Sequence, residues 1–249
     1  MLSDPELLRY ARQILLPQID LAGQQKLKRS TMAIVGLGGL GSPVVQYLAA
    51  AGVGRLILID FDRVELSNLQ RQPIHQTDQI GQFKVNSAAQ HIAKLNPHTQ
   101  VSVMTQPLAE SDPEHWLPKV DMVLDCSDNF ATRHYLNQMT WQFHKPLISA
   151  AVVRFEGQLT VFDRQIKHSP CYRCLYAESS DQTTCSDNGV LSPAAGMLGC
   201  MQAVEAIKHC LNIGTPLVGK LLIVDVLHWQ IRTITLPKDK LCSNCGFNC

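Results

Sequence analysis

Short, continuous apolar runs alternate with longer segments of helical periodicity in the first 150 residues. The runs predict buried strands at Thr31–Val35, Arg55–Ile59, Val101–Met104, Met122–Leu124 and Leu147–Val153. The periodic segments predict helices at Ser42–Ala51, Lys84–Leu95 and Ala131–Phe143. This alternation indicates an α/β protein with a doubly wound, Rossmann-like and mostly parallel sheet.

Two helices are expected before the first strand, within residues 1–30. Ser3 and Glu6 have the spacing of a capping box, and Pro5 is tolerated in a first helical turn. A helical apolar stripe follows at Leu7, Leu8, Ala11, Ile14 and Leu15. Arg12 falls nearer the polar side of that helix, and a second short helix is expected over Leu21–Arg29.

The pattern changes after about Ala151. Short alternating segments predict strands that extend the sheet in antiparallel fashion, at Gln158–Phe162, Leu221–Asp225 and Gln230–Leu236. Ser192 as N-cap and Pro193 as first residue predict the start of a further helix. Glu178–Asn188 is polar and aperiodic, which predicts a flexible loop. We therefore expect one domain over 1–249, with N-terminal helices (1–30), a nucleotide-binding core (31–150) and a mixed-sheet region (151–249).

Composition and charge exclude several classes of function. The formal net charge is +1 and the basic residues are scattered, so nothing favours binding to nucleic acid or to anionic lipid. No segment approaches the ~20 apolar residues of a membrane helix. The N-terminus lacks the layout of a signal peptide. These features predict a cytoplasmic protein with no membrane or nucleic-acid partner.

A glycine-rich turn follows the first predicted strand. Gly36, Gly38 and Gly41 match G-x-G-x-x-G between a strand and a helix, the context of a phosphate-binding turn. Asp60 ends the second strand, where an acid can bind ribose hydroxyls. Tight packing without a ligand is the less favoured interpretation. The motif leaves NAD and ATP both open, and taken alone it favours a dinucleotide.

Charged residues downstream favour ATP. Arg71 and Lys84 follow the second strand, and Asp128 follows the strand that ends near residue 124. The carboxyl ends of parallel strands converge on one crevice. Two cations and a carboxylate there suit a triphosphate with Mg²⁺ better than a nicotinamide ring. Each residue alone would more simply be a solvated surface charge, so the inference depends on their joint position.

Four of the nine cysteines form two Cys-x-x-Cys pairs, Cys171 with Cys174 and Cys242 with Cys245. Four thiolates in two such turns suit a closed, tetrahedral Zn²⁺ site, which is structural. Disulfides are disfavoured in the cytosol. Neither pair starts a helix after a βαβ strand, so a redox motif is less favoured, and four unrelated buried cysteines remain the plain alternative.

Several motifs in a fixed order resemble the MoeB/ThiF/HesA enzymes, the bacterial relatives of ubiquitin-activating E1 enzymes. The resemblance runs from Arg9 to Cys245. It is carried by GLGGLG, LSNLQRQ at Leu66–Gln72, Lys84, LDCSDN at Leu124–Asn129 and the two cysteine pairs.

The resemblance implies adenylation of the C-terminal glycine carboxylate of a ubiquitin-like sulfur carrier that ends in Gly-Gly, with release of pyrophosphate. It implies that a homodimer forms, that Asp128 holds Mg²⁺ and that Arg12 reaches ATP bound to the other subunit. Arg12, Arg71, Lys84 and Asp128 are the implied catalytic residues. The implied ATP contacts are Gly39, Asp60, Ser67, Asn68, Leu69, Gln70, Arg71, Lys84, Asp128 and Asn129.

Three points stay open from sequence alone. Cys185 lies where the thiamine branch of the family carries a cysteine that can bind the carrier covalently, and a reactive role and an idle thiol are equally favoured. The molybdopterin branch (MoeB, with a MoaD-type carrier) is favoured over the thiamine branch (ThiF, with a ThiS-type carrier). An NAD-dependent oxidoreductase and a catalytically idle carrier-binding scaffold are the alternatives from other classes.

Overall fold

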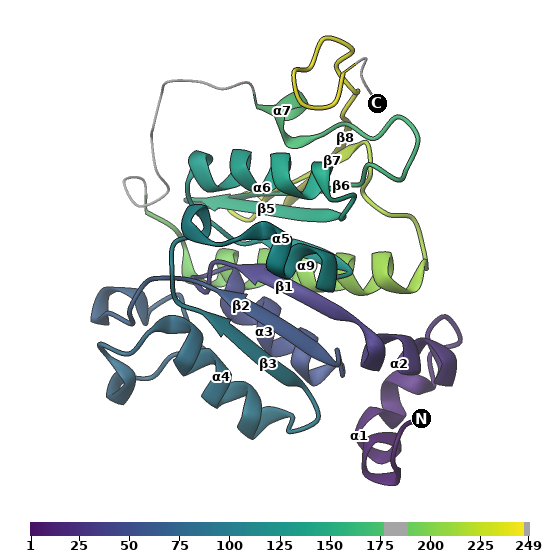
Figure 1. Cartoon of the computed structure of the whole chain (residues 1–249). Helices are drawn as coiled ribbons and strands as arrows, with labels where there is room; N and C mark the ends of the chain where they lie inside the picture. Colours follow the sequence, from purple (N-terminus) through teal and green to yellow (C-terminus); the bar gives the residue numbers. More distant parts are fainter. Residues whose placement is uncertain (177–188, 247–249) are drawn as a thin grey trace.

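An eight-stranded sheet forms the centre of the protein in the computed structural model, which describes residues 1–176 and 189–246 (Figure 1). The strand order is β3-β2-β1-β4-β5-β6-β7-β8. The first five in that order pair in parallel, and β5 to β8 pair antiparallel. The strands are β1 (Thr31–Val35), β2 (Arg55–Ile59), β3 (Gln100–Met104), β4 (Met122–Asp125), β5 (Leu147–Val153), β6 (Glu156–Phe162), β7 (Lys220–Asp225) and β8 (Gln230–Thr235). The predicted doubly wound sheet with an antiparallel extension is thus confirmed.

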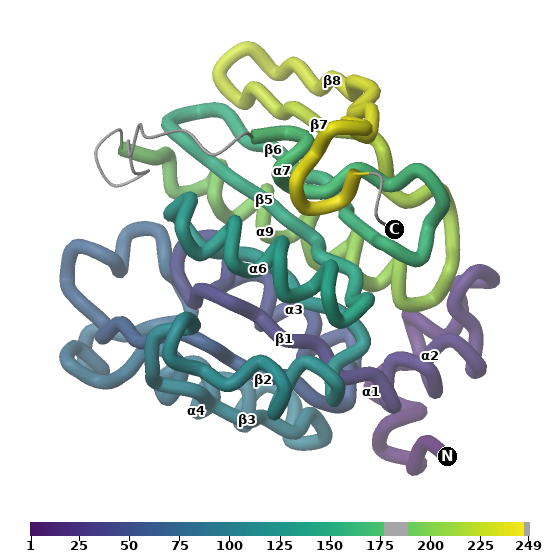
Figure 2. The backbone as a smooth tube through the Cα atoms, turned by 45° about the horizontal axis from the view of Figure 1, so that its top comes forward, coloured from purple at the N-terminus to yellow at the C-terminus, as the bar shows by residue number. Residues whose placement is uncertain are grey.

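Helices cover both faces of the parallel part (Figure 2). Those packed on one face are α3 (Gly41–Ala50), α4 (Lys84–Leu95) and α9 (Ser192–Leu211). Those on the other face are α5 (Pro113–Trp116) and α6 (Phe130–Gln142). Short 3-10 turns in the connections are η1 (Leu66–Asn68), η2 (Thr77–Gln79), η3 (Leu108–Glu110) and η4 (Leu117–Lys119).

The two faces of β1 explain why this run is uniformly apolar. Met32 and Ile34 pack into the core under α3, α4 and α9, whereas Ala33 and Val35 pack into the core under α5 and α6. Side chains alternate between the faces of a strand, so a strand covered on both sides must be apolar throughout. This burial on both faces agrees with the place of β1 inside the parallel part of the sheet, between β2 and β4.

The N-terminal helices α1 (Asp4–Ile14) and α2 (Asp20–Arg29) lie at the edge where the parallel strands begin. The predicted capping box at Ser3 and Glu6 is present. Within the described part of the chain, three of the five side chains of the predicted apolar stripe are exposed: Leu7 by 38%, Leu8 by 81% and Leu15 by 70%. Instead, α1 attaches through Tyr10, which is buried, and Gln13, which donates to the carbonyl of Ala51.

Helix α9 corrects one prediction. Its N-cap is Leu191, which has an extended backbone, and Ser192 is already helical. Leu191 N–H donates to the carbonyl of Arg154, and the carbonyl of Leu191 accepts from Ala194 N–H, so the first turn closes one residue earlier than predicted. The predicted loop Glu178–Asn188, with Cys185, lies outside the described residues.

The C-terminal segment returns to a short helix, α7 (Tyr172–Leu175), as both views show (Figures 1 and 2). In the two ranges that the structure describes, no helix is both long and apolar enough to cross a membrane.

Candidate active site

A crevice of about 440 Å³ lies at the carboxyl ends of the parallel strands. The glycine-rich turn after β1, the segments after β2 and β4, and the starts of α4 and α6 contribute to its walls. Most of the residues that the sequence predicts for nucleotide binding line it: Gly39, Asp60, Asn68, Gln70, Arg71, Lys84, Asp128 and Asn129. The topology therefore brings together residues from four separate segments of the chain.

The glycine turn runs close to the neighbouring strand end. Gly36 has φ +91°, and a Cβ atom there would lie 2.7 Å from the carbonyl oxygen of Cys126. A side chain at Gly39 would crowd the Cβ atom of Ala195 at 3.1 Å. Glycine at these positions lets the turn lie flat against β4 and α9, with the N-terminus of α3 directed at the crevice.

Leu37 of that turn is held by hydrogen bonds to both of its backbone polar groups. Its N–H donates to Asp60 Oδ2 at 2.6 Å, and its carbonyl lies 3.1 Å from Nε2 of the buried His75. Burial lowers the pKa of His75 to about 4, so the ring is neutral at pH 7. Burial also raises the pKa of Asp60 above its ordinary value. Asp60 and His75 therefore hold the backbone of Leu37 on both sides, one at its N–H and the other at its carbonyl.

Lys84 is the first residue of α4, and its Nζ atom lies 2.8 Å from Asp62 Oδ2. The guanidinium of Arg71 donates to the carbonyl of Ser67 at 3.1 Å, which anchors it beside Asn68 in η1. Both cations line the crevice. Together they place positive charge where an anionic ligand would enter.

The segment after β4 supplies the acidic side. Asp125 is fully buried and accepts hydrogen bonds from Ser127 and Ser149, so it supports the strand ends. Asp128 is exposed and lines the crevice. Asn129 caps α6 by accepting a hydrogen bond from Thr132 N–H at 2.9 Å. The only one of the two aspartates open to a ligand is therefore Asp128.

Arg133 is a crevice residue that the sequence reasoning missed. It is buried, and its Nη2 atom donates to the carbonyl of Ser127 at 2.8 Å. It lies one helical turn after Asn129, so the helical spacing from the D-N motif is the signal that could have identified it. Asp62 likewise was not predicted to contact a ligand, although it lines the crevice.

Three predicted residues do not line the crevice. Ser67 and Leu69 are outside its lining, and Ser67 acts on it through the carbonyl that holds Arg71. Arg12 is exposed on α1. Tyr10 of the same helix contacts Asn96 and Gly52, at the edge of the sheet opposite to the crevice. Within one chain, Arg12 is therefore separated from the nucleotide-binding residues.

A second cavity, of about 470 Å³, shares Val152 with the crevice. It lies between the turn that joins β5 to β6 and the turn of the β7–β8 hairpin, with Arg154, Asp225 and His228 at its walls. The hairpin exposes the apolar side chains of Leu227, Trp229, Ile231 and Ile234.

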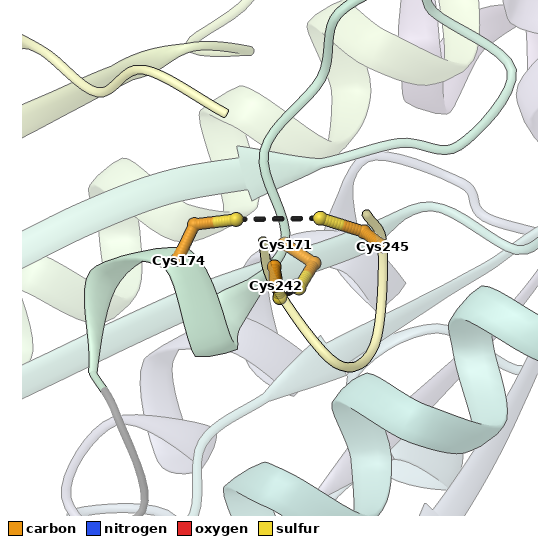
Figure 3. A group of neighbouring side chains, drawn as sticks. All are labelled: Cys171, Cys174, Cys242 and Cys245. Carbon is orange, nitrogen blue, oxygen red and sulfur yellow. Dashed lines mark hydrogen bonds between the residues drawn. The ribbon is translucent and has the colours of Figure 1, made fainter. Parts of the chain in front are cut away.

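The four paired cysteines converge. Their Sγ atoms all lie within 4.8 Å of one another, with 3.6 Å between Cys171 and Cys242 and 3.3 Å between Cys174 and Cys245 (Figure 3). Zn–S bonds of ~2.3 Å in a tetrahedron place sulfurs roughly 3.8 Å apart, so the donor set fits zinc. Hydrogen bonds from Cys171 and Cys245 lower the pKa of Cys174.

Comparisons with known proteins agree with this geometry. A molybdopterin-synthase adenylyltransferase of Escherichia coli (strain K12) is 45% identical over 246 residues, which cover 98% of this chain and 98% of that protein. The protein of the same name from Haemophilus influenzae is 46% identical over 239 residues, with 96% and 98% covered.

Among solved structures, E. coli MccB with ATP has a TM-score of 0.80 at 24% identity, covering 96% of this chain and 74% of that chain. This likeness concerns the fold alone. The profile of the ThiF family matches residues 10–244. The resemblance seen in the sequence is confirmed, and the chain belongs to the ThiF family.

Proposed function

We propose that this chain is an ATP-dependent adenylyltransferase that activates the C-terminal glycine carboxylate of a ubiquitin-like, MoaD-type sulfur carrier for molybdopterin synthesis. The observation that carries the proposal is the crevice, where Arg71, Lys84 and Arg133 face the same space as Asp128 beside a glycine-rich turn. The names of the two relatives, from Escherichia coli and Haemophilus influenzae, support the choice of reaction and carrier.

In this proposal, different crevice residues bind different parts of ATP. The backbone at Gly39 and the start of α3 receive phosphate, and Asp60 at the end of β2 receives the ribose. Arg71 and Lys84 neutralise the phosphates. The exposed carboxylate of Asp128 offers the oxygen ligand that Mg²⁺ prefers, so this residue would hold the ion.

The reaction is a displacement at phosphorus. An oxygen of the carrier's terminal carboxylate bonds to the α-phosphorus of ATP, the bond to the bridging oxygen breaks, and pyrophosphate leaves. The product is an acyl-adenylate. The protein contributes position and charge: Arg71 and Lys84 stabilise the negative charge that grows on the leaving pyrophosphate.

The second cavity is the route we propose for the carrier's tail. This cavity and the crevice share the lining residue Val152, which supports a route for the tail from this cavity towards the nucleotide. The exposed apolar side chains of the β7–β8 hairpin, at the end of the sheet, offer a folded carrier a surface beside this route.

A homodimer completes the proposed site. Part of the apolar stripe at α1 is exposed in one chain, at Leu7, Leu8 and Leu15, and Arg12 lies on the same helix. Covering that stripe with a second subunit would bury Leu8 and Leu15 and could bring Arg12 to the partner's nucleotide. We further propose zinc in the four-cysteine cluster as a structural ion, and a cytoplasmic location.

Replacing Asp128 by Asn tests the proposal directly. The enzyme should lose formation of the carrier adenylate, detected as AMP attached to the carrier, by about 100-fold or more. Asp112→Asn is the matched control, because Asn still caps α5 there. If the chain is a scaffold without activity, neither Asp128→Asn nor Asp112→Asn will form the adenylate, and that result would refute the proposal.

A further inference from the structure

One stripe of helix α6 runs from the crevice to the cysteine cluster. Asn129, Arg133, Asn137 and Trp141 follow one another at intervals of four residues, which places them along one side of the helix. Asn129 and Arg133 line the crevice. Trp141 packs against the cysteine cluster at the other end. The same rigid element thus carries residues of both sites.

Asn137 is the residue of this stripe that touches the cluster directly. Its Nδ2 atom donates to Cys171 Sγ at 3.8 Å, and its Oδ1 atom accepts from Tyr172 N–H at 2.8 Å. The side chain is only 3% exposed. Donors to a metal-bound thiolate stabilise its negative charge and fix its direction, so Asn137 is placed to act on the ligand and on the turn that bears it.

Aromatic contacts fasten the same turn to α6. The ring of Tyr172 meets His134 of α6 edge-on, with centroids 5.2 Å apart, and meets Phe162 of β6 edge-on at 6.1 Å. Tyr176 meets Phe130, the first residue of α6, at 5.7 Å. The turn from Cys171 to Tyr176 therefore lies along α6 from its middle to its first turn.

We propose that Asn137 is a positioning residue of the metal site, through which a bound zinc ion holds α6 in place and thereby sets Asn129 and Arg133 in the crevice. Zinc bonded to Cys171 fixes the hydrogen bond to Asn137, and the helix transmits that position over two turns. Rigid elements with contacts at both ends carry coupling of this kind. The crevice part of this proposal rests on the proposed ATP-binding function.

Zinc release measures the role of Asn137 without ATP or carrier. The holoprotein is mixed with a chromogenic zinc chelator and the rate of colour development is recorded. Asn137→Ala should release zinc about tenfold or more faster than the wild type, the usual effect of losing a partner of a metal ligand. Asn96→Ala is the matched control, since Asn96 is also buried and donates two side-chain hydrogen bonds, to Tyr10 and Ala49, far from the cysteines.

Asn137→Asp serves if the alanine variant does not fold. It keeps the shape and the acceptor for Tyr172 N–H but replaces the N–H donor with a negative charge beside the thiolates. It too should release zinc faster than Asn96→Ala. Equal release rates for the Asn137 variant and the control overturn the role of Asn137, whatever the fate of the proposed adenylation.

The coupling is tested by titrating wild-type protein with a non-hydrolysable ATP analogue before and after zinc removal. We expect several-fold weaker binding to the zinc-free protein, whereas zinc-loaded Asn96→Ala should bind like the wild type. Equal affinities with and without zinc overturn the coupling. By reciprocity, the analogue should strengthen the equilibrium binding of zinc to the wild type by the same factor, measured by competition with a chelator of known zinc affinity.

Discussion

The Nζ atom of Lys84 lies 2.8 Å from the carboxylate of Asp62, although the lysine side chain is 6% exposed and the aspartate side chain 51% exposed. The backbone N–H of Lys84 also donates to the carbonyl of Asp62, at 2.9 Å. A buried cation is thus held at the start of α4 by one carboxylate that faces the crevice. The ion pair with Asp62 lets the lysine stay charged and available to a phosphate group, without leaving an unpaired charge in the core.

Lys84→Met should remove most of the activity and leave the fold intact. Methionine fills the space of the lysine stem but cannot neutralise the leaving pyrophosphate. We expect carrier-dependent exchange of pyrophosphate into ATP to fall about 100-fold or more. Lys94→Met, an exposed position on the same helix, should exchange at the wild-type rate. Equal exchange rates for Lys84→Met and Lys94→Met would show that Lys84 does not take part in the reaction.

Arg12 and Lys84 should complement each other between subunits. Neither Arg12→Ala nor Lys84→Met should exchange pyrophosphate alone. After the two are mixed and allowed to exchange subunits, each mixed dimer has one site with both residues intact. Random pairing then restores about a quarter of the wild-type rate.

The control for this mixing experiment is Arg9→Ala, because Arg9 is exposed on the same helix and donates to the carbonyl of Leu95 in its own chain. Arg9→Ala should be active without a partner. If mixing Arg12→Ala with Lys84→Met restores nothing while mixed dimers are present, Arg12 does not act across the interface.

His75 should make stability depend on pH. Its pKa falls from an ordinary 6.5 to about 4 on folding, mainly through burial. Between those values the unfolded chain binds more protons, so the free energy of unfolding should drop as pH falls from 6.5 towards 4. His75→Leu should lower it by about 1–3 kcal/mol at pH 7.5, because the Leu37 carbonyl loses its partner.

The cost of His75→Leu should shrink at pH 5, where the wild type has lost part of its advantage. Urea unfolding at the two pH values measures both quantities, with His98→Gln, an exposed position, as control. A mutational cost that is the same at both pH values would contradict the buried, neutral state of His75.

The sequence identified the centre of the fold with its boundaries. β1 and β2 have the predicted bounds because they are apolar on both faces and a continuous run of that kind has few other structures. β6 begins at Glu156, two residues before the prediction, because its register with β7 extends to Glu156 and Asp225. Pairing with the neighbouring strand determines where a strand begins or ends, and this pairing cannot be deduced from a single sequence.

The motif residues of the site could be predicted from the sequence, but its buried residues could not. The glycine-rich turn and Asp128 follow predicted strands, and Lys84 belongs to the motifs that carry the family resemblance, so the sequence reveals all three. Arg133 does not stand out, because an arginine in an amphipathic helix looks like a surface residue until the fold buries it beside Ser127. The exposure of Leu8 and Leu15 could not be predicted either, since periodicity does not say whether an apolar stripe is covered.

The most direct test of the central claim is pyrophosphate–ATP exchange with purified carriers. We predict exchange with a MoaD-type carrier ending in Gly-Gly, much slower exchange with a ThiS-type carrier, and none when the terminal glycine is removed. Faster exchange with the ThiS-type carrier would reassign the chain to the thiamine branch. No exchange with any Gly-Gly carrier, despite bound ATP, would contradict the proposed function.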